Sequence, residues 1–181
     1  MMNHDTYSDD YIASILQEAR VFAFVGASSN TSRPSYFAMK YLLAKGYKVI
    51  PVNPGLAGQE ILGQRVEERV SGLKGPVDVI DVFRNSEAAF DVTRDAVAMK
   101  DTLELKVVWM QLGVRNDAAA KLAEAAGLRV VMNRCPKIEY GRLSGEIGWS
   151  GINTGRITSL RPKLAPFGVQ NQVIGKATGR G

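Results

Sequence analysis

The sequence has a single cysteine and a single histidine among its 181 residues. Cys135 alone cannot form a disulfide within the chain, and His4 alone cannot build a histidine-rich metal site. No apolar run approaches the ~20 residues that a membrane-spanning helix needs, and residues 1–5 lack the basic and apolar regions of a secretory leader. We therefore expect a cytoplasmic protein with no membrane-spanning segment and no bound metal.

Charge is distributed unevenly along the chain. Lys and Arg number 23 against 18 Asp and Glu, which gives a formal net charge of +5. Residues 141–181 contain six of the basic residues and one acidic residue, so residues 1–140 carry 17 of each sign. The basic tail leaves nucleic-acid binding open as one alternative function, although the tail has few charges and no interleaved aromatic residues. A polyphosphate ligand of the main part needs a local arrangement of groups rather than overall charge.

Short apolar runs alternate with helix-length segments of mixed polarity between residues 20 and 132. This order is typical of a parallel sheet covered by helices on both faces. The expected strands are Val21–Val25, Lys48–Val52, Val77–Phe83, Lys106–Met110 and Arg129–Met132, and a short extra strand is considered near Ile61–Val66. Because crossovers between parallel strands are right-handed, we predict a single-domain α/β fold with a Rossmann-like, doubly wound, mostly parallel sheet.

Helix boundaries carry their own signals. Polar residues that can cap helix N-termini are Ser8 before Asp9–Ala19, Ser35 before Tyr36–Lys45, Ser86 before residues 87–100 and Asn116 before residues 117–126. Gly46 and Gly127 suit left-handed C-terminal positions. The domain is expected over residues 8–140, and residues 141–181 are expected to form a basic, Gly/Pro-containing extension that is partly irregular or disordered.

The loop after the first strand is the first candidate for ligand binding, because ligands in such sheets lie beyond the carboxyl ends of the strands. It runs from Gly26 to Ser35 and leads straight into a helix. Gly26 permits close approach of a ligand to the backbone, while hydroxyl and N–H groups and the helix N-terminus favour phosphate oxygens. Arg33 adds a formal positive charge. These features favour phosphate binding over an ordinary strand-to-helix loop.

Two signals of a dinucleotide site are absent. The Gly-x-Gly-x-x-Gly fingerprint needs glycines at positions that Ser28 and Thr31 occupy here. The second strand is followed by Asn53 instead of the acidic residue that commonly binds the adenosine ribose of NAD. The sequence therefore argues against NAD.

Other residues follow the later strands. Arg84 comes directly after the third expected strand and is a candidate second cation for the ligand, while Gln111 and Gly113 follow the fourth. Asp78 and Asp81 lie three residues apart, so strand alternation places them on opposite faces. We expect them to make structural hydrogen bonds rather than to form a catalytic pair, and we expect Trp109 to belong to the core.

Cys135 follows the last expected strand and could act as a nucleophile. A Cys–His arrangement needs a histidine in the same cleft, but His4 lies in an N-terminal segment that we expect to be mobile. A buried or half-buried structural thiol is therefore favoured. An enzyme that uses Cys135 in acyl or redox chemistry remains an alternative.

Five segments together resemble a known family: Val25–Ser28, Arg33–Tyr36, Gly46–Pro54, Val82–Arg84 and Asn133–Glu139. The chain resembles the small, stand-alone bacterial CoA-binding proteins, whose domain is similar to the N-terminal domain of the succinyl-CoA synthetase α subunit. The resemblance implies that Asn53 and Pro54 border the adenosine and that Val82–Arg84 pass under the pantetheine and pyrophosphate. It also implies that the nucleotide phosphates meet Gly26, Ser28, Arg33 and Ser35. A carboxylate after the second strand would repel the 3′-phosphate of CoA, which agrees with its absence.

The candidate ligand-binding residues are Gly26, Ala27, Ser28, Arg33, Ser35, Asn53, Pro54, Val82, Phe83, Arg84, Gln111 and Gly113. No catalytic or metal-ligating residue is assigned. The larger synthetase uses a phosphorylated histidine in a second domain, and the present sequence offers no histidine beyond His4. We therefore expect a protein that binds coenzyme A or an acyl-CoA as a non-catalytic carrier, sensor or regulatory module, either as a monomer or as a homodimer.

Overall fold

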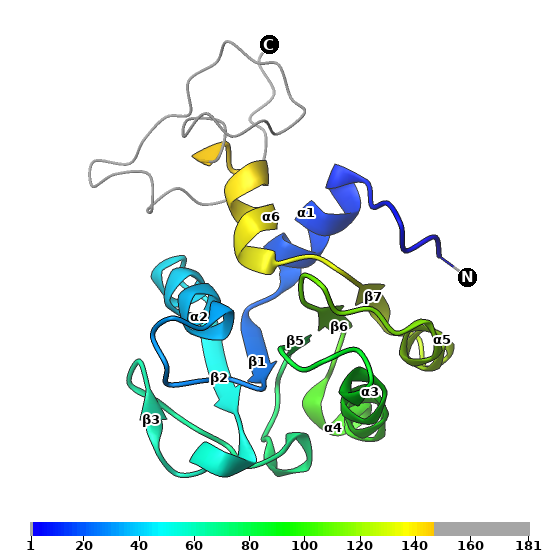
Figure 1. The fold of residues 1–181 in the computed structure, drawn as a ribbon. Coiled ribbons are helices and arrows are strands. Elements are labelled where there is room, and N and C mark those ends of the chain that lie inside the picture. Colours follow the sequence, from blue (N-terminus) through cyan, green and yellow to red (C-terminus); the bar gives the residue numbers. More distant parts are fainter. Residues whose placement is uncertain (1, 147–181) are drawn as a thin grey trace.

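The computed structural model describes residues 2–146, and Figure 1 shows their arrangement. The strands are β1 (Val21–Val25), β2 (Lys48–Val52), β3 (Glu60–Ile61), β4 (Gln64–Arg65), β5 (Val79–Val82), β6 (Val107–Met110) and β7 (Arg129–Val131). The α-helices are α1 (Asp9–Glu18), α2 (Pro34–Ala44), α3 (Ala88–Ala98), α4 (Lys100–Leu103), α5 (Asp117–Ala125) and α6 (Pro136–Leu143). Two short 3₁₀ helices cover Pro54–Leu56 and Val70–Gly72.

Five strands form one parallel sheet in the order β2-β1-β5-β6-β7. The strand order reverses between β1 and β5, which is the arrangement of a doubly wound sheet. The predicted Rossmann-like α/β fold is confirmed. The extra strand considered near Ile61–Val66 is wrong as a single element, because the chain reverses through Leu62 and Gly63, both with positive φ, and pairs β3 with β4 as a separate antiparallel hairpin.

Helices pack on both faces of the sheet, and each face has its own core (Figure 1). Alternation along β1 sends Phe22 and Phe24 toward α1, α2 and α6, whereas Ala23 faces the side of α3 and α5. Trp109 is fully buried on the same face as the two phenylalanines and donates its indole N–H to the Arg134 carbonyl at 2.8 Å, so its predicted core position is confirmed.

Two of the four predicted N-cap residues, Ser8 and Asn116, cap their helices in the structure. The Ser8 side chain accepts from the N–H of Tyr11, and Asn116 accepts from Ala119. The prediction for Ser35 is wrong because the chain already turns into helix at Pro34, which leaves Ser35 buried inside the first turn of α2.

The prediction that Ser86 caps the next helix is also wrong. Helix α3 begins at Ala88, and the Asn85 side chain accepts from the Ala88 N–H at 2.9 Å. The Ser86 hydroxyl instead accepts from the backbone N–H of Arg115 at 3.0 Å. Ser86 therefore joins the loop after β5 to the loop after β6.

Helix α6 crosses the expected domain boundary at residue 140 and continues to Leu143, so residues 141–143 are helical rather than irregular. The remainder of the expected extension, residues 147–181, lies outside the described residues. Within residues 2–146, no helix combines the length and the apolar character required to cross a bilayer.

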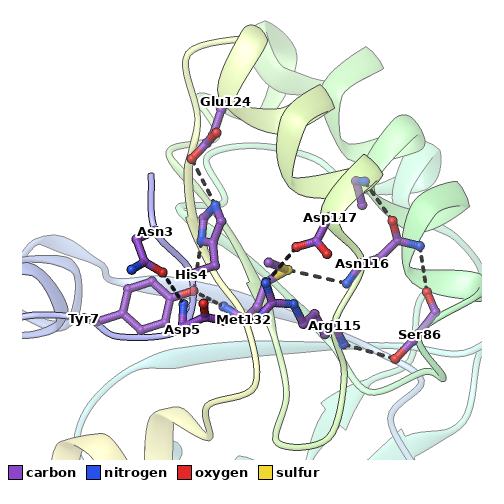
Figure 2. Close-up of polar contacts among 11 residues, drawn as sticks. Asn3, His4, Asp5, Tyr7, Ser86, Arg115, Asn116, Asp117, Glu124 and Met132 are labelled. Atoms are coloured by element: carbon purple, nitrogen blue, oxygen red, sulfur yellow. Dashed lines mark hydrogen bonds and ion pairs between the residues drawn. The ribbon is translucent and has the colours of Figure 1, made fainter. Parts of the chain in front are cut away.

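The N-terminal segment packs against the domain, so the expectation that His4 is mobile is wrong (Figure 2). His4 is only 8% exposed. The Tyr7 hydroxyl accepts from the Met132 N–H at 2.7 Å and is therefore free to donate to His4 Nδ1 at 3.0 Å. His4 Nε2 then donates to Glu124 Oε1 at 3.1 Å. These bonds fix the N-terminal segment to α5 and to the residue after β7.

Candidate functional site

A cavity of about 710 Å³ opens at the carboxyl ends of the parallel strands, a volume typical of small-molecule sites. The loops after β1, β2, β5, β6 and β7 contribute to its walls, together with the first turns of α2 and α6. The lining residues are Gly26, Ala27, Ser28, Arg33, Pro34, Ser35, Phe37, Ala38, Asn53, Phe83, Arg84, Gln111, Leu112, Val114, Cys135, Lys137 and Ile138.

Gly26 is held in a position that other residues cannot adopt without strain. Its φ is +93°, and its N–H donates to the Val52 carbonyl at 2.9 Å. A Cβ atom at this position would lie 2.6 Å from the Phe83 carbonyl oxygen and 2.9 Å from Arg84 Cδ. The absence of a side chain therefore lets the loop after β1 lie directly against the residues that follow β5.

Asn53 connects the loop after β2 to the same place. Its side-chain amide donates to the Ala27 carbonyl at 2.7 Å and accepts from the Gly55 N–H at 2.9 Å. The residue after β2 thus supports the loop after β1 as well as lining the cavity. A neutral amide at this position leaves the edge of the cavity without the negative charge that would repel a phosphate.

Two helix N-termini lie at the cavity. Helix α2 begins at Pro34 and α6 begins at Pro136, and each proline occupies the first helical position, where a missing N–H costs nothing. Their first turns line the cavity through Ser35 and through Lys137. The partial positive charges of these N-termini favour an anionic ligand.

Three cationic side chains also line the cavity: Arg33, Arg84 and Lys137. Among residues 2–146, no carboxylate forms an ion pair with any of them. Lys137 Nζ lies 5.9 Å from the ring centroids of both Phe37 and Tyr41. The cavity therefore presents positive charge that the described part of the chain does not neutralise.

A buried polar pair lies beneath the cavity. Asp81 is fully buried, and both of its carboxylate oxygens accept from Gln111 Nε2, at 3.0 and 2.8 Å. Burial raises the pKa of Asp81 well above its ordinary value, and the hydrogen bond from Gln111 offsets only part of this shift. Gln111 lines the cavity, whereas Asp81 does not. The hydrogen bonds to Asp81 therefore hold the side-chain amide of Gln111 in one orientation at the cavity wall.

Asp78 belongs to the opposite end of β5. Its Oδ2 accepts from the N–H groups of Arg20 and Val21 at 2.8 and 3.0 Å, and its Oδ1 accepts from Lys106 Nζ at 2.6 Å. The prediction that Asp78 and Asp81 make structural hydrogen bonds is confirmed.

Cys135 lies at the cavity wall just before α6 and is half-buried, as the sequence predicted. Burial raises the pKa of its thiol, and the backbone N–H groups of Ile138 and Lys137 counteract this only in part. His4 makes its hydrogen bonds to Tyr7 and Glu124, so the thiol receives no help from this imidazole.

Most of the residues singled out from the sequence are brought together. Nine of the twelve line the cavity, whereas Pro54, Val82 and Gly113 do not. Pro54 is exposed at the start of a 3₁₀ helix, Val82 is buried in the core, and Gly113, with φ +82°, donates its N–H to the Asn133 side chain.

The sequence reasoning missed several apolar and helix-borne residues of the lining: Pro34, Phe37, Ala38, Leu112, Val114, Lys137 and Ile138. Phe37 had a detectable signal, because it follows Arg33 by four residues and so lies on the same helical face. Pro136 also signalled a helix start directly after the last strand, which would have placed Lys137 and Ile138 at the cavity.

Comparison with solved structures supports the fold. A hypothetical protein from Pyrococcus horikoshii OT3 is 35% identical, with a TM-score of 0.71 over 79% of this chain and 96% of that chain. Acetyl-coenzyme A synthetase 1 from Ca. Korarchaeum cryptofilum is 24% identical, with a TM-score of 0.52 over 63% of this chain and 26% of that chain. At this low identity the second likeness concerns the fold alone.

Sequence comparison identifies the family. The uncharacterized protein YneT of Bacillus subtilis (strain 168) is 32% identical over 129 residues, which are 71% of this chain and 91% of that protein. The family model described as "CoA binding domain" matches residues 20–141, which include every residue of the cavity lining. The chain belongs to the CoA binding domain family.

Proposed function

We propose that the protein binds coenzyme A or an acyl-CoA in this cavity and acts as a cytoplasmic, non-catalytic carrier, sensor or regulatory module. The observation that carries the proposal is the convergence of Arg33, Arg84 and the N-terminus of α2 on one cavity. CoA has a pyrophosphate and a 3′-phosphate, and its remaining length is an uncharged pantetheine arm. Membership of the CoA binding domain family supports the same ligand class.

The proposed position of the ligand follows the strand order. The adenosine lies toward Asn53, after β2, and the pyrophosphate lies against the loop Gly26–Arg33 and the first turn of α2. Arg84, after β5, faces the same phosphates from the other side of Gly26, since a Cβ atom on Gly26 would lie 2.9 Å from Arg84 Cδ. The pantetheine arm then continues toward the ends of β6 and β7.

The non-catalytic role is supported by the state of the reactive groups at the cavity. The Cys135 thiol has a raised pKa, which lowers the fraction of thiolate, the form that acts as nucleophile. The Asp81 carboxyl is fully buried, accepts a hydrogen bond from Gln111 and does not line the cavity. The cavity therefore offers binding groups rather than an activated nucleophile.

Isothermal titration calorimetry tests the ligand. We expect CoA to bind more tightly than either NAD or dephospho-CoA. A charge-assisted hydrogen bond contributes on the order of 1.5–3 kcal/mol, so Arg33→Ala and Arg84→Ala should each weaken CoA binding by about tenfold or more. Lys40→Ala is the matched control, because Lys40 is an exposed cation of α2 that does not line the cavity. Equal affinity for CoA and NAD would contradict the proposal.

A second candidate function is acyl or redox chemistry at Cys135, which the position of this thiol in the cavity wall favours. Incubation of the protein with a panel of acyl-CoAs, followed by mass spectrometry of protein and thioester, distinguishes the two. Turnover that is lost in Cys135→Ser supports the enzyme. Unchanged thioesters and an unmodified protein support the carrier or sensor.

A further inference from the structure

Most of the exposed large apolar side chains in the described part of the chain lie at the cavity. Four large hydrophobic residues among residues 2–146 are exposed: Phe37 (49%), Phe90 (37%), Leu112 (62%) and Ile138 (43%). Single exposed apolar residues are common on protein surfaces and need no explanation. Three of these four, however, line the cavity, and they come from α2, the loop after β6 and α6. Such a convergence of exposed apolar groups is typical of a binding surface.

Two of these residues come from helices that lie beside each other. Helix α6 packs against α2, and Lys137 Nζ, next to Ile138, lies 5.9 Å from the ring centroid of Phe37. Leu112 follows β6, whereas Arg33 and Arg84 follow β1 and β5. The cavity thus has a phosphate-binding end at the loops after β1 and β5 and an apolar end lined by α2, α6 and the loop after β6.

The pantetheine arm is long enough to connect the two ends. Neighbouring strands lie about 4.8 Å apart, so the two steps from β1, which precedes Arg33, to β6, which precedes Leu112, span roughly 10 Å. The pantetheine chain has twelve bonds between its phosphate oxygen and its sulfur, and at about 1.2 Å per bond it extends roughly 14 Å. A CoA whose pyrophosphate lies near Arg33 can therefore bring its sulfur to the apolar end.

We propose that Phe37, Leu112 and Ile138 form a subsite for the aliphatic acyl group of an acyl-CoA. This inference rests on the proposed function, since it places CoA in the cavity, and it names the class of thioester that the cavity prefers. A free thiol would leave the three side chains exposed to water. An acyl chain of several carbons covers them, and burial of apolar surface supplies the affinity.

Lys137 lies at the same end of the cavity and could select a charged acyl group instead of an aliphatic one, so the experiment has to distinguish the two. Its ammonium group would favour an acyl group that ends in a carboxylate. In the structure this ammonium group instead lies 5.9 Å from the ring centroids of Phe37 and Tyr41, within the range of a cation–π contact. Butyryl-CoA and succinyl-CoA both carry four acyl carbons and differ in the terminal carboxylate, so they form a matched pair.

Calorimetry with CoA and with its acetyl, butyryl, hexanoyl and succinyl thioesters tests the subsite on the full chain. We expect the affinity to rise about twofold for each added CH₂, so that hexanoyl-CoA binds at least tenfold more tightly than acetyl-CoA. Butyryl-CoA should bind more tightly than succinyl-CoA. Leu112→Asn and Ile138→Gln should each reduce the hexanoyl-to-acetyl ratio to about threefold or less, and should weaken the binding of hexanoyl-CoA more than that of CoA.

Phe90→Gln is the control, because Phe90 is an exposed apolar residue on α3 that does not line the cavity. This variant should keep the full dependence on chain length. Equal affinities for acetyl-CoA and hexanoyl-CoA, or tighter binding of succinyl-CoA than of butyryl-CoA, would overturn the aliphatic subsite while leaving CoA binding intact. Failure of all five compounds to bind would contradict the proposed function itself.

Discussion

At the amino edge of the parallel sheet the chain neutralises its own charge, whereas at the carboxyl edge it does not. Asp78, before β5, is enclosed by the N–H groups of Arg20 and Val21 and by the Lys106 ammonium. At the other edge, Arg33 and Arg84 line a cavity and form no ion pair among residues 2–146. The charged group at the amino ends of the strands is therefore paired within the protein. The guanidinium groups at the carboxyl ends are not paired with a carboxylate of residues 2–146, so they are available to an anionic ligand.

Substitution of one glycine at each edge of the sheet tests this contrast, and we expect the largest effect on stability at Gly26. Gly26 at the carboxyl edge and Gly46 before β2 at the amino edge both have positive φ, +93° and +87°. A Cβ at Gly26 meets the Phe83 carbonyl oxygen at 2.6 Å, whereas a Cβ at Gly46 meets nothing within 4 Å. Left-handed strain alone costs roughly 1–2 kcal/mol. Gly46→Ala should cost about that much, and Gly26→Ala about 3 kcal/mol or more because the clash is added.

Chemical denaturation measures these free energies of unfolding, and calorimetry measures CoA binding by the folded variants. Gly26→Ala should lower CoA affinity at least tenfold because the loop after β1 must move away from the residues after β5. Gly46→Ala should bind CoA as the unmodified chain does. Equal destabilisation by the two substitutions would show that the close approach at Gly26 does not distinguish the carboxyl edge.

Asp78 provides the corresponding test of the amino edge. Asp78→Asn removes the charge that Lys106 and two backbone N–H groups share, so we expect a loss of about 2 kcal/mol in the free energy of unfolding at neutral pH. CoA affinity should not change, because Asp78 does not line the cavity. Denaturation and titration on the same variant check both expectations. A large loss of CoA binding with unchanged stability would break the proposed division of roles between the edges.

The fold and the phosphate side of the site were predictable because their signals are local. Each strand is a short apolar run, and the rule that ligands lie after such strands pointed to Gly26, Arg33, Arg84 and Gln111. All four line the cavity. Strand ends were placed within two residues, with the largest error at β5, which begins at Val79 instead of Val77.

The remaining features depend on contacts between residues that are distant in sequence. Leu112 and Ile138 look like core residues in an apolar pattern, and only the tertiary arrangement leaves them exposed at the cavity. Likewise, the Asp81–Gln111 pair spans 30 residues, and the His4–Glu124 contact spans 120. Periodicity and spacing describe neighbouring residues, so they cannot predict contacts between residues that are this far apart in the sequence.

The smallest expected effect concerns the pH dependence of stability, where the two aspartates of this region should behave in opposite ways. For Asp78, burial acts to raise the pKa, but the hydrogen bonds from Lys106 and from the N–H groups of Arg20 and Val21 outweigh it and lower the pKa. Its contribution to stability is therefore present above the ordinary aspartate pKa of about 4 and is lost as the pH falls through the lowered value. The stability difference between the unmodified chain and Asp78→Asn should shrink in that acidic range.

For Asp81, burial raises the pKa, so the sign reverses. Its contribution is fully present below about pH 4 and is lost as the pH rises toward the raised value in the folded protein, with a slope of at most about 1.4 kcal/mol per pH unit. Denaturation of the unmodified chain and of Asp81→Asn across this range should show a stability difference that shifts in favour of the variant as the pH rises. A difference that shrinks in acid for both aspartates would mean that Asp81 is stabilised as a carboxylate, and the carboxyl end of β5 would then resemble its amino end.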